Sequence, residues 1–182
     1  MTRQQLEHVI RACATIADDD EIVVIGSQSI LGQFPDAPEE LRVSVEADVF
    51  PRNHPERWDL IDGSIGEGSP FHEAFGYYAQ GVAEDTATLP VGWRDRLVPV
   101  HNPNTRGATG LCLEPHDLVI SKYVAGREKD DHFVRAAIKH RLVDPEVLRA
   151  RLATTTLDDA RRAHVTARIA RDAGLATVTS AI

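Results

Sequence analysis

The hydrophobic and polar positions at the start of the chain predict a helix followed by a buried strand. Thr2 and Gln5 have the spacing of a capping box, and apolar side chains recur at helical spacing through residues 6–16. We expect the helix to end at the acidic residues 18–20, which we interpret as a solvated turn and not as a metal-binding cluster. The short apolar run of residues 22–25 then predicts a buried strand.

A second strand is predicted at residues 43–49, where apolar and polar side chains alternate. The apolar members of this run would share one face of the strand: Val43, Val45, Ala47 and Val49. The opposite face would then carry the carboxylates of Glu46 and Asp48, two residues apart. This pair is the first candidate for chemistry in the chain.

The middle of the chain predicts three more strands, at residues 77–82, 97–100 and 110–113. A helix is expected over residues 55–63, and Ser69-Pro70 has the pattern of a helix start. The glycine-rich residues 63–81 leave two interpretations open. They form either a flexible connection or a loop that lines a substrate cleft with His72, Glu73 or Tyr78.

From residue 114 onward the pattern is helical, so we divide the chain into a core of residues 1–113 and a C-terminal helical portion, residues 114–182, that packs on it. Pro115 and Gly126 have the positions of a first helical residue and a helix stop. Three more helices are expected, at residues 131–141, 145–152 and 157–173. Gly174 is predicted to end the last one, with a loose tail after it.

Composition indicates a soluble globular protein. The chain has 182 residues, 42% of them hydrophobic and 26% charged, which is enough to bury a core. It contains no apolar run of about 18 residues and no leader-like start, so we expect a cytoplasmic protein without membrane contact. Cys13 and Cys112 lack metal-ligand spacing and are predicted to be reduced core residues.

The charge is unevenly distributed. The net charge is −8, yet residues 122–182 hold 12 Lys and Arg against 8 Asp and Glu, whereas residues 1–121 hold 8 against 20. Two interpretations stay open: amphipathic helices with solvated arginines, or a basic surface beside an acidic metal site, as a phosphate-bearing substrate needs.

The acid pair and the first strand supply two halves of a nucleotide site. Two carboxylates on one strand face repel each other unless a cation lies between them, and hard oxygen ligands suit Mg²⁺ or Mn²⁺. The Gly26-Ser27 turn after the first strand can present backbone N–H groups to a phosphate. Asp95 is a further acid, but Arg94 and Arg96 flank it, so we leave it out of the site.

This arrangement of Gly26-Ser27-Gln28-Ser29 followed by Glu46-Ala47-Asp48 resembles the polymerase-β-like nucleotidyltransferase superfamily, in which the first acid is usually Asp. A second segment resembles AbiEii-type and MenT-type toxin nucleotidyltransferases and their small relatives. Its matching residues are Pro115, Asp117, Leu118, Lys122, Ala125, Arg127, Lys129 and Asp130. Phe133 stands where those proteins often have another Asp, so no role is carried over to that position.

The resemblance implies an α/β (α+β) nucleotidyltransferase fold, a mixed β-sheet flanked by helices, with an NTP as substrate. Glu46 and Asp48 would hold Mg²⁺ or Mn²⁺, and Lys122 would neutralise charge on the leaving phosphates. The residues expected to bind the nucleotide are Gly26, Ser27, Ser29, Arg127, Lys129 and Asp130. Arg127 and Lys129 could instead contact RNA, and Asp130 could orient Lys122, act as a further acid or cap a helix.

By the same resemblance, the acceptor would be RNA, at the 3′ end of a tRNA, and the protein would be the toxin of a toxin–antitoxin system with a cognate antitoxin as partner. Two alternatives remain open. One is nucleotidyl or phosphoryl transfer to a protein or a small molecule. The other is a catalytically inactive member of the fold that acts as a binding module or antitoxin, although the chain retains both acids, the Gly-Ser turn and Lys122.

Overall fold

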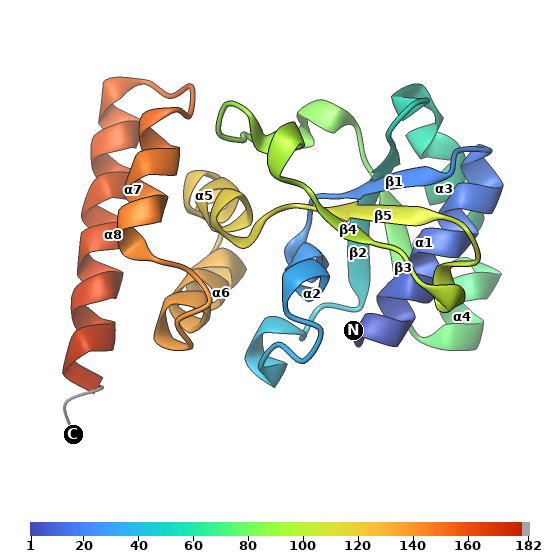
Figure 1. Cartoon of the computed structure of the whole chain (residues 1–182), viewed down its shortest axis with the longest axis horizontal. Coiled ribbons are helices and arrows are strands. Elements are labelled where there is room, and N and C mark those ends of the chain that lie inside the picture. The colour runs from blue at the N-terminus through green and yellow to red at the C-terminus, as the bar shows by residue number, and fades with distance from the viewer. Residues whose placement is uncertain (180–182) are drawn as a thin grey trace. The chain divides into compact units, whose positions relative to one another are not determined.

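The computed structural model of the chain describes residues 1–179 and divides into two compact units. The first, which we call the sheet unit, comprises Met1–Thr86 and Arg96–Glu114. The second, the helical unit, comprises Ala87–Asp95 and the chain from Pro115 onward. Figure 1 shows the elements of each unit. None of the described helices is both long and apolar enough to cross a membrane.

The sheet unit is built on a five-stranded mixed sheet, as predicted. Its strands are β1 (Glu21–Val24), β2 (Glu46–Pro51), β3 (Tyr78–Gly81), β4 (Val98–Val100) and β5 (Thr109–Cys112). Their order across the sheet is β3-β2-β1-β5-β4. The central strand β1 runs antiparallel to β2 and parallel to β5, and β3 runs parallel to β2. The predicted α/β fold, a mixed sheet with flanking helices, is therefore confirmed.

Helices α1 (Arg3–Ala17) and α2 (Ile30–Gln33) lie on the same face of this sheet. α1 begins with the predicted capping box. It packs closely against β5 at Gly110, where an added Cβ would lie only 2.3 Å from Cδ1 of Ile10. α2 approaches the same strand at Gly32, where a Cβ would lie 2.5 Å from Cβ of Cys112. Both cysteines are free and buried, as predicted. Helices α3 (Trp58–Ile65) and α4 (Pro70–Phe75) complete the unit, with Ser69 as the predicted N-cap of α4.

The start of β2 differs from the prediction. The strand begins at Glu46, and Val43 and Val45 are 76% and 46% exposed instead of sharing a buried face with Ala47. β1 pairs with β2 only from Val49 onward, so residues 43–45 lie before the part of the chain that runs beside β1. This preceding segment is held by the Met1 amino group, which donates to the carbonyl oxygens of Ser44, at 2.8 Å, and Arg42.

The acidic turn of residues 18–20 is not wholly solvated, which corrects a second prediction. Asp19 is buried and accepts hydrogen bonds from the backbone N–H groups of Glu21, Asn53 and His54, at 3.0, 2.7 and 3.1 Å. The Asn53 amide donates to it as well, at 2.9 Å. Asp19 therefore ties the start of β1 to the segment that follows β2.

The helical unit contains α5 (Pro115–Ala125), α6 (Glu128–Lys139), α7 (Pro145–Ala153) and α8 (Asp159–Thr179). Gly126 ends α5 with a φ of 65°, as predicted. The predicted stop at Gly174 is wrong, because α8 continues to Thr179. A single glycine costs a helix only about 1 kcal/mol relative to alanine, which the rest of a long helix can offset. The predicted loose tail is thus helical as far as Thr179, and residues 180–182 lie outside the described part of the chain.

Candidate active site

Strand β2 places Glu46 and Asp48 on the face of the sheet away from α1. Gly110 faces α1 and pairs with Ile22, and residues two apart along a strand share a face, so Val49, the partner of Val24, faces α1 as well. The residues that alternate with Val49 therefore point the other way. Both carboxylates are partly exposed, in contrast to the buried side chains of Ala47 and Val49 between and beside them.

The two sequence motifs meet where Asp48 lies against Gly26. A Cβ built on Gly26 would lie 1.8 Å from Oδ2 of Asp48, so any side chain at position 26 would displace the carboxylate. The backbone N–H of Ile25 donates to the carbonyl of Asp48, at 3.0 Å, which fixes the two chains side by side. Glycine is needed here for space, because its φ of −83° is open to any residue.

The chain turns after Gly26 through a 3₁₀ segment, η1 (Ser27–Ser29), that leads into α2. The backbone N–H of Ser29 donates to the carbonyl of Gly26, at 2.9 Å. Because this N–H is already used, Ser29 would bind a phosphate through its hydroxyl. Among the described residues, the Ser29 hydroxyl and both polar atoms of the Gln28 amide are buried without a hydrogen-bond partner. Buried polar groups are normally paired, which indicates that a polar ligand or water completes this turn.

Strand β3 brings a further residue to the acid pair. Tyr78 pairs with Glu46 across the sheet, and its hydroxyl donates to Oε2 of Glu46, at 3.0 Å. Burial, then the hydrogen bond to Glu46 and the charge of that carboxylate, raise the pKa of Tyr78 to about 12. The ring of His72, on α4, lies 4.6 Å from that of Tyr78, whereas Glu73 is exposed. The glycine-rich segment therefore contacts the acid pair directly through Tyr78, and His72 in turn contacts Tyr78.

The donor set fits a divalent cation that brings further ligands with it. Among the described residues, no group of three or more His, Cys, Asp or Glu side chains is arranged to hold a metal ion. Mg²⁺ is commonly bound by one or two carboxylates, with substrate phosphates and water completing its shell. Glu46 and Asp48, partly exposed on one strand face beside the Gly26 turn, match that requirement.

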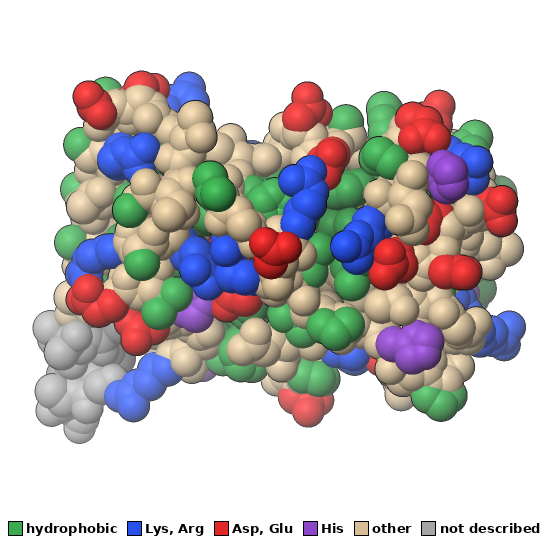
Figure 2. Space-filling view, turned by 45° about the horizontal axis from the view of Figure 1, so that its top comes forward, with side chains coloured by type: hydrophobic (Ala, Val, Ile, Leu, Met, Phe, Trp, Pro, Cys, Tyr) green, Lys and Arg blue, Asp and Glu red, His purple; other side chains and the backbone are tan. Residues whose placement is uncertain are grey.

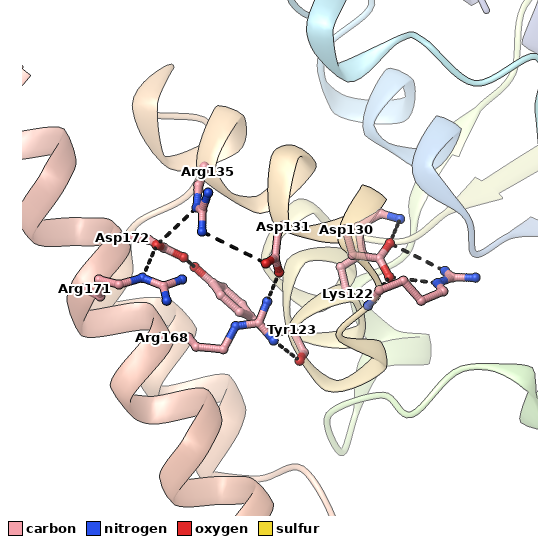
Figure 3. A network of polar contacts seen from close by, with 9 residues as sticks. Lys122, Tyr123, Asp130, Asp131, Arg135, Arg168, Arg171 and Asp172 are labelled. Carbon is pink, nitrogen blue, oxygen red and sulfur yellow. Dashed lines mark hydrogen bonds and ion pairs between the residues drawn. The ribbon is translucent and has the colours of Figure 1, made fainter.

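Lys122, predicted to be catalytic, lies in a buried ionic cluster of the helical unit (Figure 3). It is 5% exposed, and its Nζ is 3.0 Å from Oδ1 of the fully buried Asp130. Arg127 contacts the other carboxylate oxygen through Nε, at 2.8 Å. Burial would raise the pKa of Asp130, but the hydrogen bond from Arg127 and the charge of Lys122 together hold it below its ordinary value. Phe133 lies beneath the ammonium, 4.8 Å from Nζ to the ring centroid.

The predicted nucleotide-binding residues thus fall into two sets. Gly26, Ser27 and Ser29 lie with the acid pair in the sheet unit. Arg127, Lys129 and Asp130 lie with Lys122 in the helical unit, where Arg127 and Lys129 are exposed. Asp130 contacts Lys122 and also accepts from the backbone N–H of Arg127, at 3.3 Å, so it combines two of the roles considered for it: orienting Lys122 and capping α6.

A second ionic network in the helical unit was missed by the sequence analysis. The Tyr123 hydroxyl donates to Asp172, at 3.0 Å, and Asp172 also pairs with Arg171 and Arg135 (Figure 3). Arg168 pairs with Asp131 and donates to the Tyr123 carbonyl, at 3.1 Å. These partners come from α5, α6 and α8, and the pairs that join different helices link residues far apart in the sequence.

Most arginines after residue 122 have acidic partners within the helical unit. Those with ion pairs are Arg127, Arg135, Arg149, Arg151, Arg161, Arg168 and Arg171. On the face drawn in Figure 2, Lys and Arg side chains are interspersed with Asp and Glu side chains. Much of the positive charge in this part of the sequence is therefore paired with carboxylates of the helical unit itself.

A comparison with protein-family models matches residues 4–171 to a family described as "Nucleotidyltransferase of unknown function (DUF6036)". The comparisons with curated proteins and with solved structures found no match. The matched region includes the Gly26 turn, the acid pair and the cluster around Lys122. The chain therefore belongs to this DUF6036 family of nucleotidyltransferases.

Proposed function

We propose that this protein transfers a nucleotidyl group from an NTP to an acceptor hydroxyl, using Mg²⁺ or Mn²⁺ held by Glu46 and Asp48. The acceptor oxygen forms a bond to the α-phosphorus as the bond between the α- and β-phosphates breaks, so pyrophosphate leaves and the hydroxyl proton passes to solvent. The observation that carries the proposal is the contact of the Asp48 carboxylate with Gly26, which joins the acid pair to the Gly-Ser turn. A phosphate site and a cation site side by side are what an NTP needs, because its charge and its metal are bound together.

In this proposal Glu46 and Asp48 would hold the cation, which would neutralise the triphosphate and polarise the α-phosphorus when bound. The backbone of the Gly26-Ser27 turn and the hydroxyls of Ser27 and Ser29 hold phosphate oxygens. The buried hydroxyl of Ser29 has no hydrogen-bond partner in the described part of the chain, which supports that role.

We assign Lys122 to the leaving phosphates, where a positive charge stabilises the transition state. Its pairing with Asp130 supports a fixed position for the ammonium, and a fixed donor loses less entropy when it meets a phosphate. Arg127 and Lys129 are the accompanying phosphate or RNA contacts. The competing role for Lys122 is purely structural, and a comparison of Lys122 and Arg151 variants separates the two roles.

For the acceptor, we propose RNA, at the 3′ end of a tRNA, on the basis of the resemblance to AbiEii-type and MenT-type toxins. In that case the protein is a toxin that blocks translation and has a cognate antitoxin. The second candidate is transfer to a protein or small molecule. The internal ion pairs of the helical unit favour it, because arginines engaged with Asp and Glu are less available to a nucleic acid backbone.

The experiment supplies the protein with Mg²⁺ and each of the four NTPs, labelled at the α-phosphate, together with total RNA or a cell extract depleted of RNA. The matched control is the Glu46→Gln/Asp48→Asn variant. We expect label on RNA of tRNA size for one NTP and none with the control. Label only on protein or on small molecules rejects the RNA acceptor and supports the second candidate. No label on any acceptor contradicts the proposed activity itself.

A further inference from the structure

The first acid of the site, Glu46, is a glutamate, which has one more rotatable side-chain bond than an aspartate. A longer carboxylate side chain loses more conformational entropy when it is held in one geometry. A site that uses Glu46 as a metal ligand therefore benefits from a group that restricts this side chain before the metal arrives.

Tyr78 is placed to do this. It lies directly opposite Glu46 in the β2–β3 register, and its hydroxyl donates to Oε2 of Glu46, at 3.0 Å. Hydrogen bonds to charged groups are stronger than those between neutral ones, so this contact can fix the carboxylate. The neighbouring Tyr77 does not share the role, because its hydroxyl is 2.7 Å from Nδ1 of His8.

The Tyr78 ring is itself supported from the glycine-rich segment. His72 lies against it, with ring centroids 4.6 Å apart. Nδ1 of His72 accepts a hydrogen bond from the backbone N–H of Gly68, at 3.0 Å, and the hydroxyl of Ser69 accepts from the backbone N–H of His72, at 3.2 Å. A continuous set of contacts thus runs from residues 68–72 through Tyr78 to the carboxylate of Glu46.

We propose that Tyr78 is a positioning residue that preorganises Glu46 for the divalent cation, with His72 holding the Tyr78 ring in place. The inference rests on the proposed function of Glu46 as a metal ligand. It also gives the glycine-rich segment a function, because the segment carries His72 to Tyr78. Groups that orient metal ligands commonly change metal affinity by about 10- to 100-fold when they are removed.

The test is a double-mutant cycle on metal affinity, with Mn²⁺ alone as the probe and free Mn²⁺ followed by electron paramagnetic resonance. The proteins are the wild type, Tyr78→Phe, Glu46→Asp, the double variant and Tyr77→Phe as the matched control. We expect Tyr78→Phe to weaken Mn²⁺ binding at least about tenfold in the wild type. In the Glu46→Asp background the loss should fall below about threefold, because the shorter carboxylate no longer reaches the Tyr78 hydroxyl. Tyr77→Phe should leave Mn²⁺ affinity unchanged.

Equal losses in the wild-type and Glu46→Asp backgrounds, or no loss in either, would overturn the positioning role of Tyr78. Such a result leaves the proposed function standing if the wild type still binds Mn²⁺ and Glu46→Gln weakens that binding. If the wild type binds no Mn²⁺ on its own, the preorganising role fails, while the metal site that substrate phosphates complete is still decided by the transfer assay. If Glu46→Gln binds Mn²⁺ as tightly as the wild type, both the inference and the metal site fail. Melting temperatures of all variants exclude unfolding as the cause of any loss.

Discussion

The carboxylate of Asp48 occupies the space that a side chain at position 26 would need, since a Cβ on Gly26 would lie 1.8 Å from its Oδ2. Gly26→Ala should therefore displace the carboxylate, destabilise the fold by about 1–3 kcal/mol and abolish nucleotidyl transfer. Chemical denaturation and the labelled-NTP assay measure the two effects. The control is Gly63→Ala in α3, where a Cβ meets no atom of the described residues within 4 Å and should stabilise the helix. Full activity of Gly26→Ala would contradict the role of this contact.

Lys122→Met tests the buried ionic cluster. It removes one partner of Asp130 and leaves Arg127, so we expect a loss of stability of about 3 kcal/mol, the lower end of the range for breaking a buried pair. If Lys122 also contacts the leaving phosphates, turnover of the folded variant should fall by orders of magnitude.

The control for Lys122 is Arg151→Met, which breaks the contact of Arg151 with the fully buried Asp117, at 3.1 Å. It should also lower stability but leave turnover of the folded protein close to that of the wild type. If the two variants lose the same share of turnover, Lys122 is structural and its catalytic assignment is wrong.

Asp19 should make the stability of the protein depend on acid pH. Burial alone would raise its pKa, but the hydrogen bonds from Glu21, Asn53 and His54 outweigh that effect and lower it. A carboxyl with a lowered folded-state pKa stabilises the protein above its unfolded pKa, about 3.9, and loses this contribution as pH falls through the folded value.

The free energy of unfolding of Asp19→Asn should accordingly be lower than that of the wild type by about 1–3 kcal/mol at neutral pH, with the gap closing below about pH 4. Asp18→Asn is the control, because the Asp18 side chain is exposed and asparagine tolerates its left-handed backbone. A gap that stays constant down to the acid limit would show that the charge of Asp19 is not what stabilises the turn.

Gln28 offers a test of whether the Gly-Ser turn is completed by a ligand. Its amide is buried with neither polar atom partnered among the described residues. Replacing it with Leu should raise the stability of the ligand-free protein by about 1–3 kcal/mol, because an unsatisfied polar group is removed. Urea denaturation measures this change. A clear loss of stability would instead indicate that ordered water pairs with the amide in the free protein.

The sheet could be predicted because its strands are short apolar runs bounded by turn residues, and the first helix because its capping box is local. The onset of β2 could not, since the alternation of Val43 and Val45 carries no information on where β1 stops pairing. Burial of Asp19 depends on Asn53 and His54, 34 and 35 residues away. Sequence patterns therefore do not predict the features that depend on contacts between residues far apart in the chain.

The same holds for the candidate site. Glu46, Asp48 and the Gly26 turn could be named from spacing, because strand periodicity and a glycine stop are local signals. The sequence indicates Tyr78 only as one of three candidates in a glycine-rich segment. The β2–β3 register, which places Tyr78 opposite Glu46, cannot be predicted from the sequence of either strand alone. The ion pair of Lys122 with Asp130 corresponds to only one of the three roles that the sequence leaves open for Asp130.

In the proposed function, Glu46 and Asp48 hold the cation for nucleotidyl transfer. This role is tested most directly by the rate at which label from an α-labelled NTP reaches the acceptor, with Mg²⁺ or with a chelator, for the wild type and Glu46→Gln/Asp48→Asn. We predict transfer by the wild type only with Mg²⁺, and none by the variant, whose melting temperature should equal or exceed that of the metal-free wild type because the repulsion is removed. Transfer by the folded variant at the wild-type rate would contradict the assignment.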